Sequence, residues 1–225
     1  MASPTLKRVR IAASVGFVAL CMLGALSQKV TAADPLTRFD SSVLETLHRH
    51  ASPTGLRDAA FVSRIGSPTA MTILAVSGAL LLALAGEWIV LCGWVAAFTG
   101  ASLLDRWLKL TIHRPRPAYA ASLIHHGTWS FPSGHAMGSL VGFGMLAYVL
   151  LLFATRDPKL RAGIVVLLGF LIIAIGLSRL YLGVHYFSDV AGGYAAGLLW
   201  LSACVAAVEL ARRRRRYALR LHPTG

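Results

Sequence analysis

Three short segments of the sequence concentrate the side chains that could carry out chemistry. They are residues 109–117, 132–135 and 178–189, which are rich in Lys, Arg, His, Ser and Asp. The third segment places His185 and Asp189 four residues apart, so both side chains would lie on one face of a helix. A carboxylate that accepts a hydrogen bond from one imidazole nitrogen leaves the other nitrogen as a nucleophile. We therefore predict that Asp189 orients His185 as a nucleophile.

A second histidine, His135, lies in a different segment and could serve as an acid and base. It could protonate a leaving oxygen and then activate water. Lys109, Arg116 and Arg179 could bind a phosphoryl group, because Arg offers a planar fork to phosphate oxygens and Lys a point charge. Three cations can neutralise the transferred group, so we expect neither a metal ion nor another cofactor.

Ser133 and Gly134 precede a predicted helix, whose first backbone N–H groups and positive dipole end attract anions. Gly134 has no side chain, so a phosphate could approach the backbone closely. Together with the cations, these residues predict a cage for a phosphoryl-transfer transition state. We expect the segment 118–131, which carries three aromatic residues, to cover this site or to rest at a membrane interface.

Each of these features alone has a simpler explanation. A single Arg at a membrane helix end is usually an interfacial anchor, a single His usually packs in a core, and Asp four residues after His can be a plain helix pair. The presence of all three segments favours a shared site. Asp105 and Arg106 could pair with each other or support the site, and we expect His113 at the surface.

The composition indicates that helices in a membrane position these side chains. Of 225 residues, 56% are hydrophobic and only 14% are charged, whereas a soluble domain has about 25% charged residues. The mean hydropathy is +0.65. The three cysteines lie inside apolar runs without a CxxC spacing, which argues against a zinc site or a disulfide scaffold. The net charge of +13 is better explained by membrane topology than by nucleic acid, so we expect no nucleic-acid partner.

Six apolar stretches are long enough to cross a bilayer, which requires about 20 helical residues. They cover residues 11–28, 65–86, 88–104, 136–154, 162–178 and 190–208. Because backbone groups in a bilayer must be paired within the segment, each stretch should be a helix. The sequence therefore predicts an all-α, polytopic membrane bundle of about six transmembrane helices.

Basic residues predict the orientation of this bundle. With six spans, the N-terminus, the loop after the fourth span and the C-terminus share one side, and they hold 12 of the 22 Lys and Arg residues. This side is expected to be cytoplasmic, with both termini there. The other ten basic residues, including the site cations, then face the exterior or periplasm, and phosphate binding would explain them.

The chain divides into four parts. Residues 1–33 are a first transmembrane helix or signal anchor, although Thr31-Ala-Ala also resembles a signal-peptide cleavage site. The other parts are an extracytoplasmic segment at 34–64 with a possible interfacial helix, a membrane core at 65–210 and a basic cytoplasmic tail at 211–225. The interfacial helix is suggested by Leu36, Phe39, Val43, Leu44 and Leu47, which recur at near-helical spacing.

The three segments resemble the signature of the type 2 phosphatidic acid phosphatase superfamily, which is related to the haloperoxidases: K-x6-RP, PSGH and SR-x5-H-x3-D. Every key position matches, and the resemblance extends over about residues 60–210. It implies a metal-independent membrane phosphatase with a phosphohistidine intermediate. It also implies His185 as the nucleophile, Asp189 as its partner and His135 as the acid and base. The implied phosphate ligands are Lys109, Arg116, Ser133, Gly134 and Arg179.

The resemblance leaves the substrate open. We expect the substrate to be a lipid phosphate or diphosphate, such as undecaprenyl diphosphate, phosphatidate or phosphatidylglycerol phosphate. We expect the protein to lie in the cell membrane, most simply the inner membrane of a bacterium. Two alternatives remain: a phosphotransferase that uses the same histidine, and a non-catalytic protein that binds lipid phosphate. The oligomeric state and the pathway are left open by the sequence.

Overall fold

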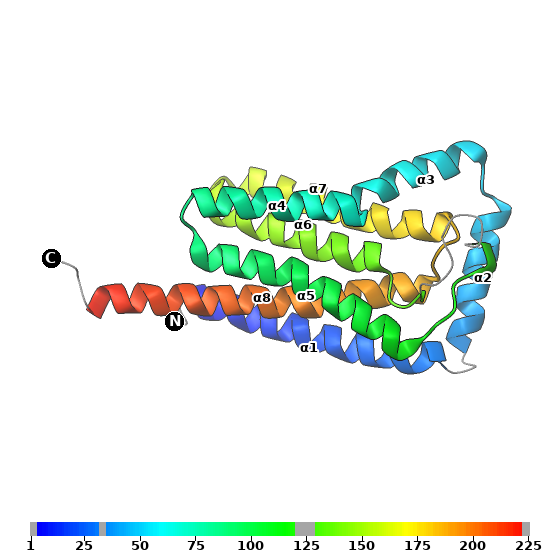
Figure 1. Ribbon diagram of the computed structural model, residues 1–225, viewed down its shortest axis with the longest axis horizontal. Helices are drawn as coiled ribbons and strands as arrows, with labels where there is room; N and C mark the ends of the chain where they lie inside the picture. Colours follow the sequence, from blue (N-terminus) through cyan, green and yellow to red (C-terminus); the bar gives the residue numbers. More distant parts are fainter. Residues whose placement is uncertain (1–3, 32–34, 120–128, 222–225) are drawn as a thin grey trace.

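The described part of the chain is a bundle of long helices capped at one end by a shorter helix (Figure 1). The computed structural model describes residues 4–31, 35–119 and 129–221. The helices in these ranges are α1 (Pro4–Thr31), α2 (Pro35–Arg49), α3 (Pro53–Ile65), α4 (Pro68–Leu84), α5 (Trp88–Ile112), α6 (Gly134–Phe153), α7 (Pro158–Tyr181) and α8 (Phe187–Leu221).

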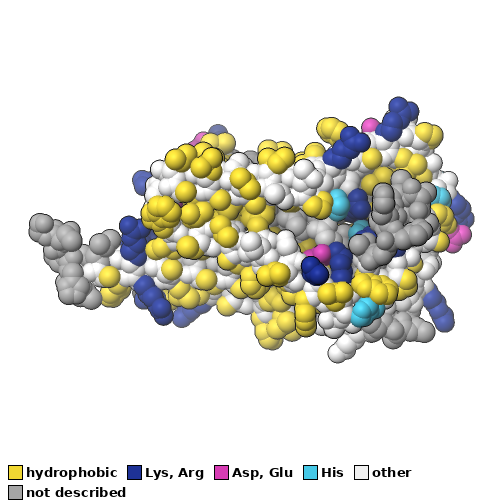
Figure 2. Space-filling view, in the orientation of Figure 1, with side chains coloured by type: hydrophobic (Ala, Val, Ile, Leu, Met, Phe, Trp, Pro, Cys, Tyr) yellow, Lys and Arg dark blue, Asp and Glu magenta, His cyan; other side chains and the backbone are white. Residues whose placement is uncertain are grey.

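Six stretches of helix in the described ranges are long and apolar enough to cross a membrane. They are α1, the α3–α4 pair, α5, α6, α7 and α8. Many of their large apolar side chains point outward, among them Phe17, Leu84 and Val166. Figure 2 shows hydrophobic side chains over the middle of the molecule and Lys and Arg gathered towards its two ends. The predicted polytopic, all-α membrane bundle is therefore confirmed.

The helices extend beyond the charge-free stretches that predicted them. α5 continues past Asp105 to Ile112, and α8 begins before Asp189 and continues past Glu209. These charges do not end the helices because each finds a partner near the end of the bundle. Asp105, for example, lies one helical turn from Lys109 and pairs with it at 2.6 Å. Most of the chemistry-bearing residues thus lie on helix ends, whereas Arg116 and His185 lie in the loops next to them.

α8 lies at the centre of the packing and contacts α1, α5 and α6. Its small residues allow this close approach. A Cβ atom on Gly193 would lie 2.6 Å from the carbonyl oxygen of Ser133, so only Gly lets the start of α6 sit against α8 here. The Ser133 N–H donates to the Asp189 carbonyl at 2.9 Å across the same contact. This packing fixes the second segment of the sequence against the third.

α2 is the predicted interfacial helix, and it runs across one end of the bundle, roughly perpendicular to the long helices in Figure 1. It contacts α1, α7 and α8. Leu44 is buried against the bundle, whereas Phe39 is half exposed. One buried residue of this helix, Asp40, is a carboxylate. The helix is therefore part of the packed structure as well as amphipathic.

α1 packs along α8, and its residues Ala12, Ala19 and Leu23 are buried. Arg8 on α1 forms an ion pair of 2.9 Å with Glu209 on α8, and the Glu209 side chain is only 1% exposed. Without α1, this carboxylate would lose its charge partner in a region with little water. The packing therefore gives α1 a structural role in the bundle.

We expect the purified protein to keep residues 1–33, which intact-mass measurement checks. We also expect Arg8→Gln to lower the free energy of unfolding by about 1–3 kcal/mol. This is less than the loss for a fully buried pair, because Arg8 is half exposed. Arg10→Gln, on the exposed surface of the same turn, is the matched control. A mature protein that begins after Ala33 would contradict this expectation.

Candidate active site

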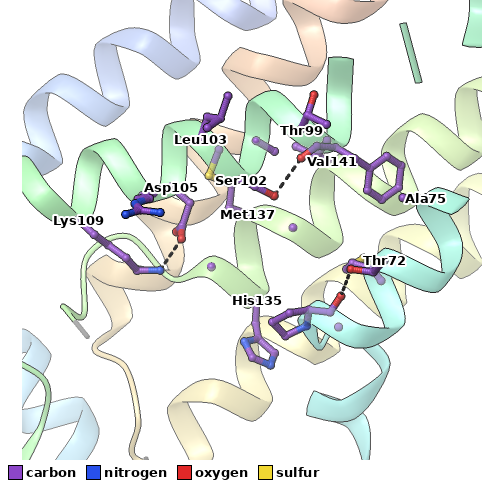
Figure 3. A pocket seen from close by; sticks show the side chains of 18 of the residues that line it. Thr72, Ala75, Thr99, Ser102, Leu103, Asp105, Lys109, His135, Met137 and Val141 are labelled. Atoms are coloured by element: carbon purple, nitrogen blue, oxygen red, sulfur yellow. Dashed lines mark hydrogen bonds and ion pairs between the residues drawn. The ribbon is translucent and has the colours of Figure 1, made fainter. Parts of the chain in front are cut away.

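The three segments meet at one end of the bundle, around a cavity of about 1020 Å³. Six predicted site residues line this cavity: Lys109, Arg116, Gly134, His135, Arg179 and His185. They come from the end of α5, the loop after it, the start of α6, the end of α7 and the loop before α8. Figure 3 shows Lys109 on α5 and His135 at the start of α6, with Thr72 of α4 opposite. The helix ends therefore assemble one site from distant parts of the chain.

His185 is held between a carboxylate and a guanidinium. Its Nδ1 lies 3.5 Å from Asp189 Oδ2, and its Nε2 lies 3.2 Å from Arg116 Nη1. Arg is a donor only, so Nε2 is the acceptor and the proton of the neutral ring resides on Nδ1, facing Asp189. The lone pair of Nε2 is thereby directed to the side of the ring where the cations lie. This is the tautomer that a nucleophilic imidazole requires.

His185 stays neutral at ordinary pH. Burial, together with Arg116 and Arg179, lowers the pKa of His185 to about 4 against the opposing effect of Asp189. A protonated imidazole has no lone pair to attack phosphorus. The depressed pKa therefore leaves the ring unprotonated at neutral pH, as a nucleophilic role would require.

Asp189 lies behind His185 and is not exposed to the cavity. Its Oδ2 accepts the backbone N–H of Tyr186 at 2.9 Å, as expected for the first turn of α8. The distance of 3.5 Å from Oδ2 to the imidazole is long for a hydrogen bond, and catalytic hydrogen bonds often shorten only when substrate binds. The two groups thus lie close together, but not on one helix face as the spacing predicted, because His185 lies in the loop just before α8 and only Asp189 is in the helix.

Each of the three predicted cations is fixed by a protein contact. Arg116 Nη1 donates to the Val184 carbonyl at 3.0 Å, and Arg179 Nη1 donates to Ser63 Oγ at 2.5 Å. Lys109 Nζ pairs with Asp105 Oδ2 at 2.6 Å (Figure 3). Positioned donors of this kind lose little freedom when an anion binds between them. Arg179 Nε has no hydrogen-bond partner although it is buried.

The start of α6 has room for an anion at Gly134 but not at Ser133. A Cβ atom on Gly134 would lie 3.1 Å from Lys109 Nζ, so a side chain there would crowd the cage. Ser133 is fully buried and does not line the cavity. Its backbone N–H donates to the Asp189 carbonyl, so this N–H is not free as the sequence suggested. Its hydroxyl lies buried beneath the site without a hydrogen-bond partner.

Other sequence predictions have mixed outcomes. Asp105 pairs with Lys109 and not with Arg106, although both Asp105 and Arg106 line the cavity. His113 is exposed, as expected, and ends α5 in the left-handed conformation with φ of 51°. Its ring contacts Trp129, which also lines the cavity. The central part of the expected covering segment, residues 120–128, lies outside the described residues.

Sequence reasoning missed a buried polar network behind the site. Arg114 contacts Asp40, Ser188 and Asp189, with ion pairs of 2.7 Å to Asp40 and 2.6 Å to Asp189. The motif spacing singles out Arg116 and passes over Arg114. One sequence signal was available, because Asp40 interrupts the apolar face of α2 four residues after Leu36. A carboxylate at such a position needs a buried cation.

Comparisons with known proteins agree with this arrangement. A family model described as the PAP2 superfamily matches residues 81–213. Phosphatidylglycerophosphatase B of Bacillus subtilis is 39% identical over 97 residues, which cover 43% of this chain and 47% of that protein. A PA-phosphatase related-family protein of Dictyostelium discoideum is 33% identical over 118 residues, covering 47% of this chain and 44% of that protein. The matched region thus spans about half the length of these curated relatives.

The similarity extends to a solved structure. The crystal structure of a transmembrane PAP2-type phosphatidylglycerolphosphate phosphatase from Bacillus subtilis has a TM-score of 0.70 and 25% sequence identity to this chain. The match covers 86% of this chain and 93% of that one. The family model covers more than half of the sequence and includes all three segments of the site. The chain belongs to the PAP2 superfamily.

Proposed function

We propose that this protein is an integral membrane lipid phosphatase that hydrolyses a lipid phosphate or diphosphate through a phosphohistidine intermediate. The observation that carries the proposal is the convergence of His135, His185 and three cations on one cavity with apolar inner walls. Membership of the PAP2 superfamily, and the phosphatase names of the similar proteins, support it. The same geometry assigns a role to each side chain.

Substrate binding would place the phosphate among Arg116, Arg179 and Lys109. These three positive charges match the charge of a phosphoryl group, which is greatest on the equatorial oxygens in the transition state. The cavity continues between α4, α5 and α6, where Met71, Phe98 and Val141 line it. A lipid tail can lie along these apolar walls while the headgroup reaches the cations. A lipid phosphate therefore suits the cavity better than a small polar ester.

The first chemical step forms a covalent intermediate. Nε2 of His185 attacks phosphorus, the bond from phosphorus to the leaving oxygen breaks, and His135 donates a proton to that oxygen. The imidazole ring gains positive charge as the bond forms, and the Asp189 carboxylate stabilises this charge. In the second step, His135 takes a proton from water while the water oxygen attacks phosphorus. The bond to Nε2 breaks, and inorganic phosphate is released.

The substrate and the orientation are part of the proposal. The names of the curated relative and of the solved structure from Bacillus subtilis favour phosphatidylglycerol phosphate over undecaprenyl diphosphate and phosphatidate. The basic end of α8 favours the cytoplasm for both termini, with the site at the exterior or periplasmic face of a bacterial inner membrane. A phosphate-release panel of these three lipids measures the substrate preference directly.

Replacement of the nucleophile tests the reaction. We expect His185→Ala to lower kcat by at least about 1,000-fold, because the substitution removes the proposed nucleophile. His50→Ala is the matched control, since His50 is exposed directly after the end of α2 and does not line the cavity. Release of inorganic phosphate in detergent is the readout. Phosphate transfer to an added alcohol in place of release would indicate a phosphotransferase, and lipid binding by an inert wild-type protein would indicate a non-catalytic role.

The depressed pKa of His185 predicts the pH dependence. The nucleophile must be neutral, so kcat/KM should fall through the titration of His185 only near pH 4, and not near the ordinary value of 6.5. Below that pH, the rate should fall about tenfold per pH unit. The titration of the lipid phosphate, followed by phosphorus NMR, separates the substrate from the enzyme. An enzyme pKa near 6.5 for loss of the nucleophile would contradict the geometry.

A further inference from the structure

Asp40 is a fully buried carboxylate that the reaction described above does not use. It lies on α2, before the first residue that the family model matches, and none of the three motifs includes it. A buried carboxylate is costly unless cations and hydrogen bonds compensate it. Its partners therefore indicate why this position holds a charge.

Both oxygens of Asp40 are used. Oδ1 accepts the backbone N–H of Ser188 at 2.9 Å, and Oδ2 accepts from Arg114 Nη2 at 2.7 Å. The Ser188 hydroxyl also donates to Oδ2. Ser188 immediately precedes Asp189, so Asp40 holds the first turn of α8 at the residue next to the partner of the nucleophile.

Arg114 connects Asp40 to Asp189. Its Nη1 donates to Asp189 Oδ1 at 2.6 Å, and its Cζ lies 4.2 Å from the centre of the Tyr186 ring. Burial acts to lower the pKa of Arg114, but Asp189 and Asp40 raise it above its ordinary value, so the guanidinium is charged. One guanidinium thus bridges two carboxylates in a planar fork.

The charge balance of this bridge matters for catalysis. Two carboxylates and one guanidinium leave one net negative charge beside His185. Without Asp40, Arg114 and Asp189 would form a neutral pair, and Asp189 would oppose the positive charge of a phosphorylated imidazole less effectively. Arg116 and Arg179 already disfavour positive charge on this ring. A neutral cluster of Arg114 and Asp189 would therefore make His185 a weaker nucleophile.

We propose that Asp40 is a positioning residue that shares the charge of Arg114, so that Asp189 remains oriented and negative toward His185. The inference rests on the proposed phosphohistidine reaction. It gives the amphipathic helix α2 a role in the chemistry at His185, which Asp40 reaches through Arg114 and Asp189. Glu45, exposed on the same helix and paired only loosely with Arg49 at 3.9 Å, has no such role.

The test uses full-length Asp40→Asn, with Glu45→Gln as the matched control. We expect Asp40→Asn to lower kcat by about 10–100-fold, the range typical when the partner of a functional imidazole is perturbed, with KM changed less than threefold. The acid limb of kcat/KM should move to lower pH, because one negative charge near His185 is lost. The other groups that face this ring are Asp189 on α8, Arg116 in the loop, Arg179 on α7 and His135 on α6.

A double variant separates charge balance from a merely structural role. In Asp40→Asn with Arg114→Gln, Asp189 again carries the one net negative charge of the cluster. We expect its acid limb to return toward the wild-type position and its kcat to equal or exceed that of Asp40→Asn. If Asp40 had only a structural role, the losses of kcat caused by the two substitutions would add in the double variant. The acid limb of kcat/KM would then stay at the wild-type pH in both variants. Thermal unfolding and gel filtration confirm that each variant is folded.

The outcomes distinguish this inference from the proposed function. Wild-type kcat and an unmoved acid limb in Asp40→Asn would overturn the inference and leave the phosphatase proposal intact. A wild-type protein that releases no phosphate from any lipid in the panel would overturn the proposed function itself. If Asp40→Asn does not fold while the double variant does, the double variant carries the test: an acid limb at the wild-type position supports the inference, and a displaced acid limb overturns it.

Discussion

The contact between His185 and Asp189 is the interaction on which the whole site depends. It fixes the proton of a neutral imidazole on Nδ1, while Arg116 approaches Nε2 from the other side at 3.2 Å. A ring held in this way presents one lone pair in one direction. The cations, the second histidine and the apolar walls act only if that lone pair faces the phosphate they bind.

The bundle imposes this geometry through the packing of helix ends. The start of α6 lies against α8 because Gly193 leaves room for the Ser133 carbonyl. α2 closes the same end of the bundle and adds Asp40 behind the nucleophile. Most active-site residues therefore lie on packed helix ends, with Arg116 and His185 in the loops beside them, and hydrogen bonds hold these side chains in place. The cavity between α4, α5 and α6 has apolar walls that would accommodate the tail of the proposed lipid substrate.

The sequence alone was enough to predict the spans and most of the cage. Bilayer thickness makes length and hydropathy diagnostic, and fixed spacings such as that from His185 to Asp189 are local. The network of Asp40 and Arg114 could not be predicted with the same ease, because its partners lie 74 residues apart in the chain. The sequence also predicted helices that are too short, because ion pairs such as that between Asp105 and Lys109 allow a helix to continue past charged residues. The hydrogen bond from the Ser133 N–H to the Asp189 carbonyl joins distant parts of the chain, so no local sequence pattern could predict it.

Trapping of the phosphoryl-enzyme tests the central claim most directly. The protein is mixed with a lipid substrate labelled in the phosphate, quenched rapidly in base, digested and analysed by mass spectrometry. The account predicts a base-stable, acid-labile phosphate on the peptide that contains His185. Turnover without a labelled peptide, or label on a different residue, would contradict it.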